Sequence, residues 1–540
     1  MYSQGSHISF QLAETVFTIL KEWNIPGAAY NSIDRQSASS CQKGTREEVV
    51  AEISKWADGG DDCTICWLHG PAGSGKSTIA HTIAKKYASR KRLAASFFFS
   101  RGNAERSDTT KFFSTLAYQL AVSDPSTRLP MREALQNNPS ILSQTLEDQF
   151  ENLILNHIRS YSSSMIVVID GLDECEGEGS VALLKVLDHA NLKRPLPIRF
   201  FLSSRTDDRI KQTFGSYLSR TRPLDLKDFG AHDDIRAYLR KSFSELYVQN
   251  RNIMKAVKPP WPLDSDLDKI VNKADGLFIY ASTVVKFVGE RPGKEKKECE
   301  PRLPHQKLRI AMERHNGLDP LYRQVLSDAP LSSNDLFRRI IGALLLLREP
   351  VSINKLAGLL RVDDAGELLA HLDGCGSVLN IPNDDAKTIR FFHASLQDFL
   401  TDVNCSRNYF IDAMEHHIFI FDDCVQIMTN KFTSSSDGGS GIEWALSYAC
   451  RHWYYHMTYV VQGDVGIRRI NSYFGARLMG FLVKIKHDWF RLWIDGTEYG
   501  YAIENLGNDV FALASIIKVV SVNLHSNNCH VYSRTNAETF

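Results

Sequence analysis

The segment that most constrains this chain is Gly-Pro-Ala-Gly-Ser-Gly-Lys-Ser at residues 70–77. It has the form G-x-x-x-x-G-K-[ST], in which backbone N–H groups surround a phosphate and the lysine reaches its oxygens. The apolar run before it, residues 64–69, predicts a buried parallel strand. The run after it, residues 77–87, places its apolar side chains on one face of a helix. A strand, a glycine loop and a helix in this order direct N–H groups and the positive end of the helix at an anion, so we predict a phosphate-binding loop.

Individual residues of this loop have expected roles. Lys76 is predicted to reach the β- and γ-phosphates, and Ser77 to hold Mg²⁺. The alternative, a chance match in a glycine-rich turn, is disfavoured because both flanks are correct. The residues assigned to nucleotide binding in this loop are Gly70, Pro71, Ala72, Gly73, Ser74, Gly75, Lys76, Ser77 and Thr78.

A second element supplies acidic side chains. Residues 165–170 form a short apolar run that ends in Asp170, and Asp173 and Glu174 follow closely. Such a strand delivers a carboxylate to the edge of the sheet where ligands bind in open α/β folds. Taken alone, the three acids fit a metal site and a solvated loop equally well. Beside a phosphate-binding loop, Asp170 is predicted to be the Mg²⁺-side acid.

Two more apolar runs extend the predicted sheet. Residues 199–202 precede Ser203, Ser204 and Arg205, and residues 93–100 form another strand. A cation at the end of a core strand can touch a γ-phosphate, although for this segment alone an ordinary strand exit is the favoured interpretation. The predicted fold class is an α/β P-loop NTPase, with a parallel sheet flanked by helices, followed by a helical domain, a winged helix and a C-terminal helical region.

Composition narrows the functional classes. Lys+Arg and Asp+Glu are both 63, so the net charge of zero argues against a polybasic nucleic-acid or membrane-surface protein. No apolar run approaches the roughly 20 residues that span a bilayer, and no secretory signal is evident. Ten scattered cysteines suit a reducing compartment, so the expected location is cytoplasmic. His452 and His456 have a possible metal-ligand spacing, but their aromatic neighbours favour core packing.

The 540 residues exceed one compact core, and the pattern predicts five segments. Helices followed by a hairpin between residues 377 and 392 indicate a winged helix. Its candidate recognition helix carries few basic residues, Lys355 and then Arg361, so we expect a packing module and no nucleic-acid partner. The segments are a short N-terminal piece (1–40), the nucleotide-binding domain (41–226), a helical domain (227–330), the winged helix (331–402) and a C-terminal helical region (403–540).

Together the motifs resemble the NACHT-domain branch of the STAND NTPases, and most closely the NOD-like receptors of fungi. The resemblance runs from about residue 30 to about residue 459. The form Asp-Gly-hydrophobic-Asp-Glu at 170–174 is its most specific element, because a common P-loop ATPase would have Glu directly after Asp170. The other carriers are Gly44–Glu47, the phosphate-binding loop, Ser203–Arg205, Ala274–Phe278 and Phe392–Leu400.

The resemblance implies roles for further residues. Arg46 would contact the nucleobase or ribose, and Arg205 would sense the γ-phosphate. Asp173 and Glu174 would position or activate water in a slow NTPase reaction. His393 would contact the β-phosphate of a bound diphosphate and tie the winged helix to the nucleotide domain. Without the resemblance, a packed core histidine is the favoured interpretation of His393.

The resemblance also implies a function and leaves points open. The expected protein is a nucleotide-gated signalling switch that binds ATP or ADP with Mg²⁺ and self-associates in the triphosphate state. Its expected context is innate-immunity-like or self/non-self signalling with an unknown downstream protein. Relatives often have Gly-x-Pro where this chain has Gly276-Leu277-Phe278, which leaves GTP open as a ligand. We identify neither an effector domain nor a repeat array, so a truncated, degenerate or minimal switch is expected. The alternatives are a continuously cycling P-loop ATPase or motor and a nucleotide-binding scaffold that does not switch.

Overall fold

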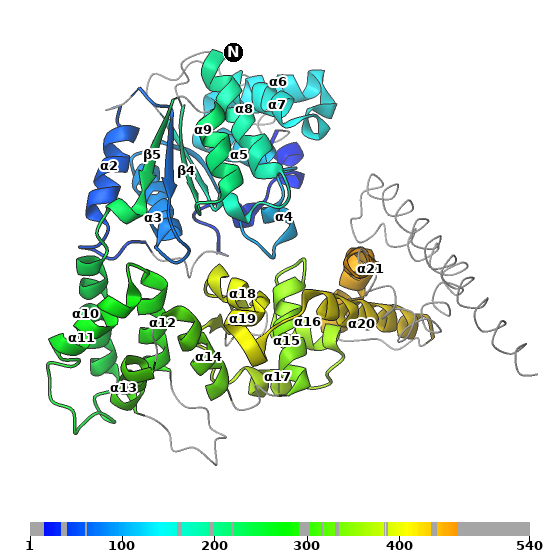
Figure 1. The fold of residues 1–540 in the computed structure, drawn as a ribbon. Helices are drawn as coiled ribbons and strands as arrows, with labels where there is room; N and C mark the ends of the chain where they lie inside the picture. The colour runs from blue at the N-terminus through cyan, green and yellow to red at the C-terminus, as the bar shows by residue number, and fades with distance from the viewer. Residues whose placement is uncertain are drawn as a thin grey trace, which may run out of the picture. The chain divides into compact units, whose positions relative to one another are not determined.

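The structure is a computed structural model whose parts are described separately below (Figure 1). The chain divides into two compact units. The first unit comprises Met1–Val325, Gly376–Val378 and Phe391–Gln397, and the second comprises Leu326–Cys375, Leu379–Arg390 and Asp398–Phe540. The described residues are 16–33, 40–59, 62–158, 165–193, 198–217, 220–290, 303–314, 317–329, 334–382, 384, 387–433 and 440–461.

A parallel sheet forms the centre of the first unit. Within the described residues it has five strands in the order β2-β3-β4-β1-β5, and every neighbouring pair is parallel. The four strands expected from the sequence are confirmed, and β5, on the outer side of β1, was not predicted. The strands are β1 (Ile65–His69), β2 (Leu93–Phe98), β3 (Met165–Asp170), β4 (Ile198–Ser204) and β5 (Thr221–Asp225).

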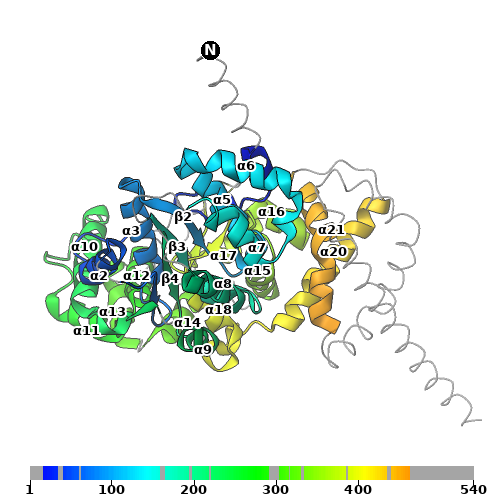
Figure 2. The same cartoon turned by 90° about the horizontal axis from the view of Figure 1, so that it is seen from above.

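Helices cover both faces of this sheet, as the view from above shows (Figure 2). Successive strand residues point to opposite faces, so each strand contributes to two cores. Cys66 and Leu68 of β1 pack with α2 and α3 on one face, while Ile65 and Trp67 pack with α5 and α8 on the other. The elements around the sheet are η1 (Pro26–Ala28), α2 (Glu47–Ala57), α3 (Lys76–Ser89), α4 (Ala104–Ser107), α5 (Phe112–Ser123), η3 (Pro125–Thr127), α6 (Arg128–Asn137), η4 (Pro139–Ser143), α7 (Leu146–Phe150), η5 (Glu151–Leu155), η6 (Leu172–Glu174), α8 (Gly179–Lys193), α9 (Asp208–Tyr217) and η7 (Leu226–Asp228).

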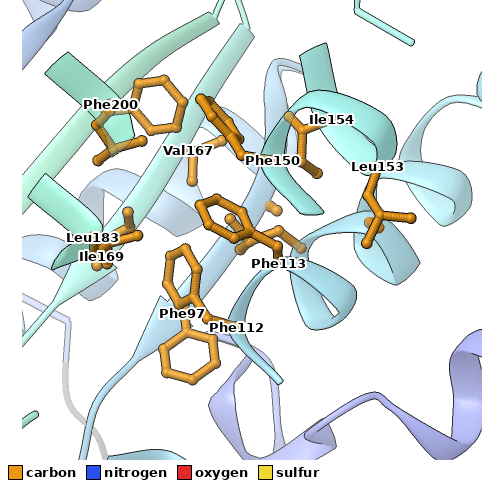
Figure 3. Close-up of a cluster of buried hydrophobic side chains, with 14 of the residues drawn as sticks. Phe97, Phe112, Phe113, Phe150, Leu153, Ile154, Val167, Ile169, Leu183 and Phe200 are labelled. Atoms are coloured by element: carbon orange, nitrogen blue, oxygen red, sulfur yellow. The ribbon is translucent and has the colours of Figure 1, made fainter. Parts of the chain in front are cut away.

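Aromatic side chains fill the core between the sheet and α5 (Figure 3). Phe113 stacks on Phe150 with ring centroids 4.9 Å apart, and Phe97 lies 4.9 Å from Phe112. Fully burying side chains of this size stabilises the fold by about 1.5–3 kcal/mol each. This core holds β2, β3 and β4 side by side and so fixes the positions of the residues that follow them.

The remainder of the first unit is helical. Residues 230–288 form three helices, as expected, and two more follow after residue 302. Asp275 and Gly276 both have left-handed backbones (φ 45° and 78°), which turn the chain sharply between α11 and α12. The helices are α10 (His232–Gln249), α11 (Asp264–Ala274), α12 (Phe278–Gly289), α13 (Pro304–Arg314) and α14 (Leu318–Asp328), the last ending in the second unit.

After the end of α14, the chain forms three helices and then two short strands that pair in a sheet of their own. The strands of the hairpin are only two residues long, so it is much smaller than the sequence pattern suggested. Lys355 of α16 lies over the ring of Trp444, and Arg361 bonds to Asp423. Both cations named in the sequence analysis are therefore engaged in packing. The elements that follow α14 are α15 (Asp335–Leu346), α16 (Ile353–Leu360), α17 (Ala365–Leu372), β6 (Leu379–Asn380), β7 (Arg390–Phe391), α18 (Ala394–Thr401), α19 (Val403–Ser406), η8 (Arg407–Tyr409), α20 (Ala413–Thr433) and α21 (Ser440–Val461). Of these, the last residue of β7 and the first four of α18 belong to the first unit.

A buried hydrogen-bonded chain joins α20 and α21. His417 Nδ1 lies 2.8 Å from His456 Nδ1, and His456 Nε2 lies 2.8 Å from the hydroxyl of Tyr448. Burial lowers the pKa of His417 to about 4 and that of His456 well below its ordinary value. His452 is paired with Glu349 at 2.8 Å. The two histidines considered as metal ligands thus lie in hydrogen-bonded helix packing.

Some expectations fall outside the described residues. They concern residues 1–15 of the predicted N-terminal piece and residues 462–540 of the predicted C-terminal helical region. Among the described helices, none combines the length and the apolar character that crossing a membrane requires.

Candidate functional site

The phosphate-binding loop connects β1 to α3, as the sequence predicts. Gly73 and Gly75 have left-handed backbones (φ 77° and 98°), and Gly75 is the N-cap residue directly before α3. A residue with a side chain adopts this conformation only with strain. The first turn of α3 contains Lys76, Ser77 and Thr78, so the unpaired N–H groups of the helix and its positive end face the loop.

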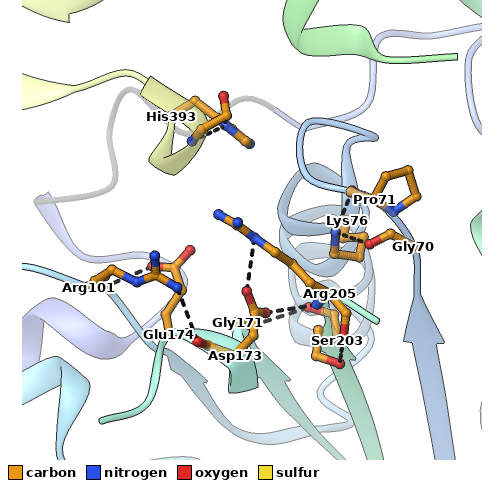
Figure 4. A network of polar contacts seen from close by, with 12 residues as sticks. Gly70, Pro71, Lys76, Arg101, Gly171, Asp173, Glu174, Ser203, Arg205 and His393 are labelled. Carbon is orange, nitrogen blue, oxygen red and sulfur yellow. Dashed lines mark hydrogen bonds and ion pairs between the residues drawn. The ribbon is translucent and has the colours of Figure 1, made fainter. Parts of the chain in front are cut away.

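Lys76 lies across its own loop. Its Nζ donates to the carbonyl of Gly70 at 2.9 Å and to that of Pro71 at 2.8 Å (Figure 4). Burial lowers the pKa of Lys76 to about 8, and the carboxylates of Asp173 and Asp170 partly oppose the shift. The amine is therefore poised near the protonation midpoint at neutral to mildly alkaline pH.

Asp170 ends β3 inside the sheet and is only 3% exposed. The hydroxyl of Ser203, at the end of β4, donates to Asp170 Oδ1, and the N–H of Gly171 bonds to the Ser203 carbonyl at 3.1 Å. The sequence analysis placed Ser203 at the strand exit without a role, and its contact with Asp170 could not be read from sequence because it depends on the order of the strands.

Asp173 is occupied by Arg205. Its Oδ1 accepts from the backbone N–H of Arg205 at 2.9 Å, and its Oδ2 lies 3.1 Å from Arg205 Nε (Figure 4). The Asp173 side chain is 8% exposed. This ion pair holds Arg205 beside the loop. The two residues, which have separate roles in the sequence-based prediction, are therefore bound to each other.

Glu174 lies in a different environment from its neighbour. Its Oε2 accepts from the backbone N–H of Arg101 at 3.0 Å, and Arg101 Nη2 lies 3.5 Å from the carbonyl of Asp173. Burial raises the pKa of Glu174 to about 7; the Arg101 N–H opposes the shift, and Asp173 and Asp170 reinforce it. A carboxylate with this pKa can take up a proton near neutrality, which is what a general base requires.

Arg46 is placed at the loop by its left-handed backbone (φ 58°) just before α2. Its guanidinium donates to the carbonyl of Ser74 at 2.8 Å and to that of Phe229 at 3.2 Å. Its backbone N–H donates to Asp234 of α10 at 3.0 Å, and its guanidinium lies 4.9 Å from the ring centre of Phe278.

The first turn of α12 packs against the phosphate-binding loop at Gly73. The N–H of Ile279 donates to the carbonyl of Gly73 at 3.0 Å. A Cβ added to Gly73 would lie 2.0 Å from Ile279 Cγ2, so only glycine fits under this helix. No sequence signal identified Ile279, because the contact joins residues about 200 positions apart.

His393 is half-buried near the same loop (Figure 4). Its Cε1 lies 3.8 Å from the point where a Cβ on Gly73 would stand. Its Nδ1 accepts from the N–H of Ser395 at 3.0 Å, and Ser395 Oγ lies 2.8 Å from the hydroxyl of Tyr322. Since Nδ1 accepts, the neutral ring carries its hydrogen on Nε2 as a donor. The residues 391–397 belong to the first unit, so this placement lies within one unit.

The residues at this site fit a Mg²⁺-nucleotide. The loop offers N–H groups and a cation for phosphate, and Asp170 offers a buried carboxylate. Mg²⁺ is commonly held by one or two protein oxygens plus phosphate oxygens and water. Within the described ranges, no group of three or more His, Cys, Asp and Glu side chains could hold a metal alone.

One family model matches part of the chain. Residues 44–205 match the family described as Nephrocystin 3, N-terminal. This range runs from the segment before Arg46 to Arg205 and so contains the loop and the acidic strand. No curated protein matches the chain. The sheet order, the loop between β1 and α3 and the acid at the end of β3 make the first unit a P-loop NTPase fold.

Similar solved structures are distant. PCH-2 of C. elegans is 15% identical with a TM-score of 0.30, covering 52% of this chain and 67% of that one. A RuvB mutant of Thermotoga maritima is 14% identical with a TM-score of 0.27, covering 67% and 96%. Cdc6p of Pyrobaculum aerophilum is 10% identical with a TM-score of 0.30, covering 71% and 97%.

Proposed function

We propose that this protein is a nucleotide-gated switch of the STAND type, in its NACHT branch. Bound ADP would hold the segment around His393 against the phosphate-binding loop, and exchange for ATP would release it and permit self-association. The signalling context proposed from the resemblance is innate-immunity-like or self/non-self recognition in the cytoplasm.

The observation that carries the proposal is the position of His393. A residue more than 300 positions after the loop lies beside Gly73, and its orientation is set by the N–H of Ser395, which donates to its Nδ1. Two short pieces of this part of the chain, Gly376–Val378 and Phe391–Gln397, belong to the same compact unit as the loop. The position of His393, which comes from that part of the chain and lies beside the phosphate-binding loop, supports a role for it in sensing the bound phosphates.

The other residues have matching roles in this proposal. Lys76 and the first turn of α3 bind the phosphates, and Ser77 and Asp170 hold the Mg²⁺, which supplies positive charge to the phosphate oxygens. Arg205, fixed by Asp173, senses the third phosphate. Reversing such an equilibrium from 1:99 to 99:1 takes about 5.5 kcal/mol of differential binding, to which a γ-phosphate and its contacts can contribute.

A continuously cycling NTPase is the second candidate. The observation in its favour is Glu174, whose pKa of about 7 suits a general base beside the phosphates. In the switch, the same group would support a slow hydrolysis that resets the protein. The two candidates therefore differ in turnover rate and in the nucleotide that stays bound.

The test begins with the nucleotide that co-purifies with the protein. For the switch, we expect one ADP per protein molecule, slow release of that ADP, and no rapid turnover of added ATP. An empty site with fast multiple turnover would favour the cycling enzyme, and a protein that binds but does not change state would favour a scaffold. The co-purifying nucleotide is identified by mass spectrometry, which also distinguishes adenine from guanine nucleotides.

The His393→Ala variant tests the gate directly. Loss of a charge-assisted hydrogen bond to phosphate costs about 1.5–3 kcal/mol, so ADP should dissociate at least about tenfold faster. The variant should also have a larger hydrodynamic size without added ligand. His232→Ala, an exposed histidine on α10, is the matched control. Equal ADP release from both variants would remove His393 from the mechanism, and global unfolding of His393→Ala would make it a core residue.

A further inference from the structure

We infer that Arg46 is a positioning residue that orients the Ser74–Gly75 peptide of the phosphate-binding loop, and that it acts through the loop without touching the base or ribose. The inference rests on the proposed nucleotide binding and assigns a role in that same site. It differs from the base or ribose contact that the family resemblance implies for this residue.

The first observation is that protein groups surround the guanidinium. The Arg46 side chain is 4% exposed. Nη2 donates to Ser74 O at 2.8 Å, Nη1 donates to Phe229 O at 3.2 Å, and Nε lies 4.0 Å from Asp234 Oδ2. One face of the group covers the ring of Phe278. Both Nη groups and this face thus contact other protein groups, while Nε is buried without a hydrogen-bond partner among the described residues.

The second observation is the identity of the carbonyl that it holds. A peptide unit is planar and trans, so the carbonyl of one residue and the N–H of the next point in opposite directions. When the Ser74 carbonyl points at Arg46, the N–H of Gly75 must point to the opposite side of the loop. Backbone N–H groups of a P-loop are its phosphate ligands. Arg46 therefore fixes the direction of one such donor.

The third observation is how firmly Arg46 is anchored. Its backbone N–H is bonded to Asp234 at 3.0 Å, and its own backbone is left-handed, so the side chain leaves α2 in a set direction. The planar guanidinium reaches two carbonyls from separate segments, at Ser74 and Phe229, which a lysine amine on a flexible stem cannot reproduce with the same geometry. The loop is thereby tied to the segment between β5 and α10.

The two roles predict different dependence on the ligand. A residue that contacts the base or ribose matters only for ligands that have one. A residue that orients a phosphate donor matters equally for every ligand with the same phosphates. Mg²⁺-tripolyphosphate carries the phosphates without base or sugar and so separates the two cases.

The experiment measures the affinities of the full chain for Mg²⁺-ATP, Mg²⁺-GTP and Mg²⁺-tripolyphosphate by calorimetry. In Arg46→Ala we expect all three to weaken by a similar factor, about tenfold for one misdirected phosphate donor. Arg46→Lys should rescue part of this loss, again equally for the three ligands. Asp234→Asn, which weakens the anchor and leaves Arg46 in place, should produce a smaller, equal loss.

Specific results would overturn the inference. A loss for ATP and GTP with unchanged tripolyphosphate binding would make Arg46 a base or ribose contact. A lower melting temperature with unchanged affinities would make it a structural residue only. If Arg46→Ala does not fold, the Arg46→Lys and Asp234→Asn pair decides between the same outcomes. Failure of the unaltered protein to bind any of the three ligands would instead contradict the proposed function, and would be seen before any variant is made.

Discussion

At the scale of single residues, the site holds a cation and a carboxyl group whose pKa values are both displaced toward neutrality. Burial disfavours the charged form of each, so it lowers the pKa of Lys76 to about 8 and raises that of Glu174 to about 7. Both groups therefore change charge within the pH range in which the protein can be studied. Raising the pH is therefore expected to weaken nucleotide binding through Lys76 and to speed hydrolysis through Glu174.

The Lys76 amine predicts that nucleotide affinity declines in alkaline solution. Below about pH 8 the free amine is charged and ready for phosphate; above it the amine is neutral and must take up a proton on binding. Affinity for Mg²⁺-ADP should fall by up to about tenfold for each pH unit above 8. Calorimetry between pH 7 and 9.5 measures this. In Lys76→Arg, whose guanidinium stays charged, the decline should disappear, and a decline that persists would assign it to another group.

Glu174 and Asp173 are predicted to separate in their effects on hydrolysis. Glu174 is protonated below about pH 7 and can act as a base above it, so single-turnover hydrolysis should rise between pH 6 and 8. Glu174→Gln should lower that rate by about 10²–10⁴-fold with nucleotide still bound. Asp173→Asn loosens Arg205 and also removes a charge that helps to raise the pKa of Glu174, so a slower reaction should keep a midpoint, moved somewhat below pH 7. Loss of the midpoint in Asp173→Asn alone would exchange the two roles.

The sequence identified residue types better than residue partners. It named Lys76, Asp170 and Glu174 because each lies in or beside a motif with fixed spacing. It did not reveal that Asp173 is bound to Arg205, because that pair joins the ends of β3 and β4, which are neighbours only through the strand order. Pairings of this kind depend on topology and leave no local pattern.

At the scale of elements, the contact between α12 and the phosphate-binding loop has a sharp steric requirement. Gly73→Ala would place a methyl group 2.0 Å from Ile279 Cγ2 on a backbone with φ of 77°. We expect a loss of about 1–2 kcal/mol from the left-handed conformation and about 1–3 kcal/mol more from the clash. Urea denaturation of the variant measures the change in free energy of unfolding.

Gly44→Ala is the matched control for this prediction. Gly44 also has a left-handed backbone (φ 87°), but nothing lies within 4 Å of an added Cβ. It should therefore lose only the conformational part. Equal losses in the two variants would mean that α12 moves aside at little cost and does not hold the loop.

Elements with a strong apolar pattern were predicted well, and weak ones were not. The strands β1, β2, β3 and β4 are continuous buried runs, and the structure has all of them. The missed strand β5 is an edge strand whose residues include Arg222 and Pro223. Proline has no backbone N–H to donate to a ladder, so an internal proline argues against a strand unless that position faces away from the neighbouring strand. Its place beside β1 is fixed by the tertiary fold, which local preference does not encode.

At the scale of the whole molecule, the division into two units predicts how a ligand affects stability. Mg²⁺-ADP at about one hundred times its dissociation constant stabilises the unit that binds it by about 2.7 kcal/mol. Scanning calorimetry should show two transitions, of which nucleotide raises only the one that belongs to the first unit. Lys76→Ala should abolish the shift. A single transition that moves as a whole would mean that the two units unfold together.

The strand order also determines when, during synthesis, the site becomes complete. β5 is the last strand of the sheet to leave the ribosome, and it pairs with β1, so the sheet cannot close until Asp225 has emerged. His393 follows about 170 residues later, which at about 5–20 residues per second is a delay of roughly 10–30 s. During that interval a nascent chain can bind cellular nucleotide before His393 has been synthesised. The nucleotide bound during synthesis would then determine the state in which each new molecule first folds.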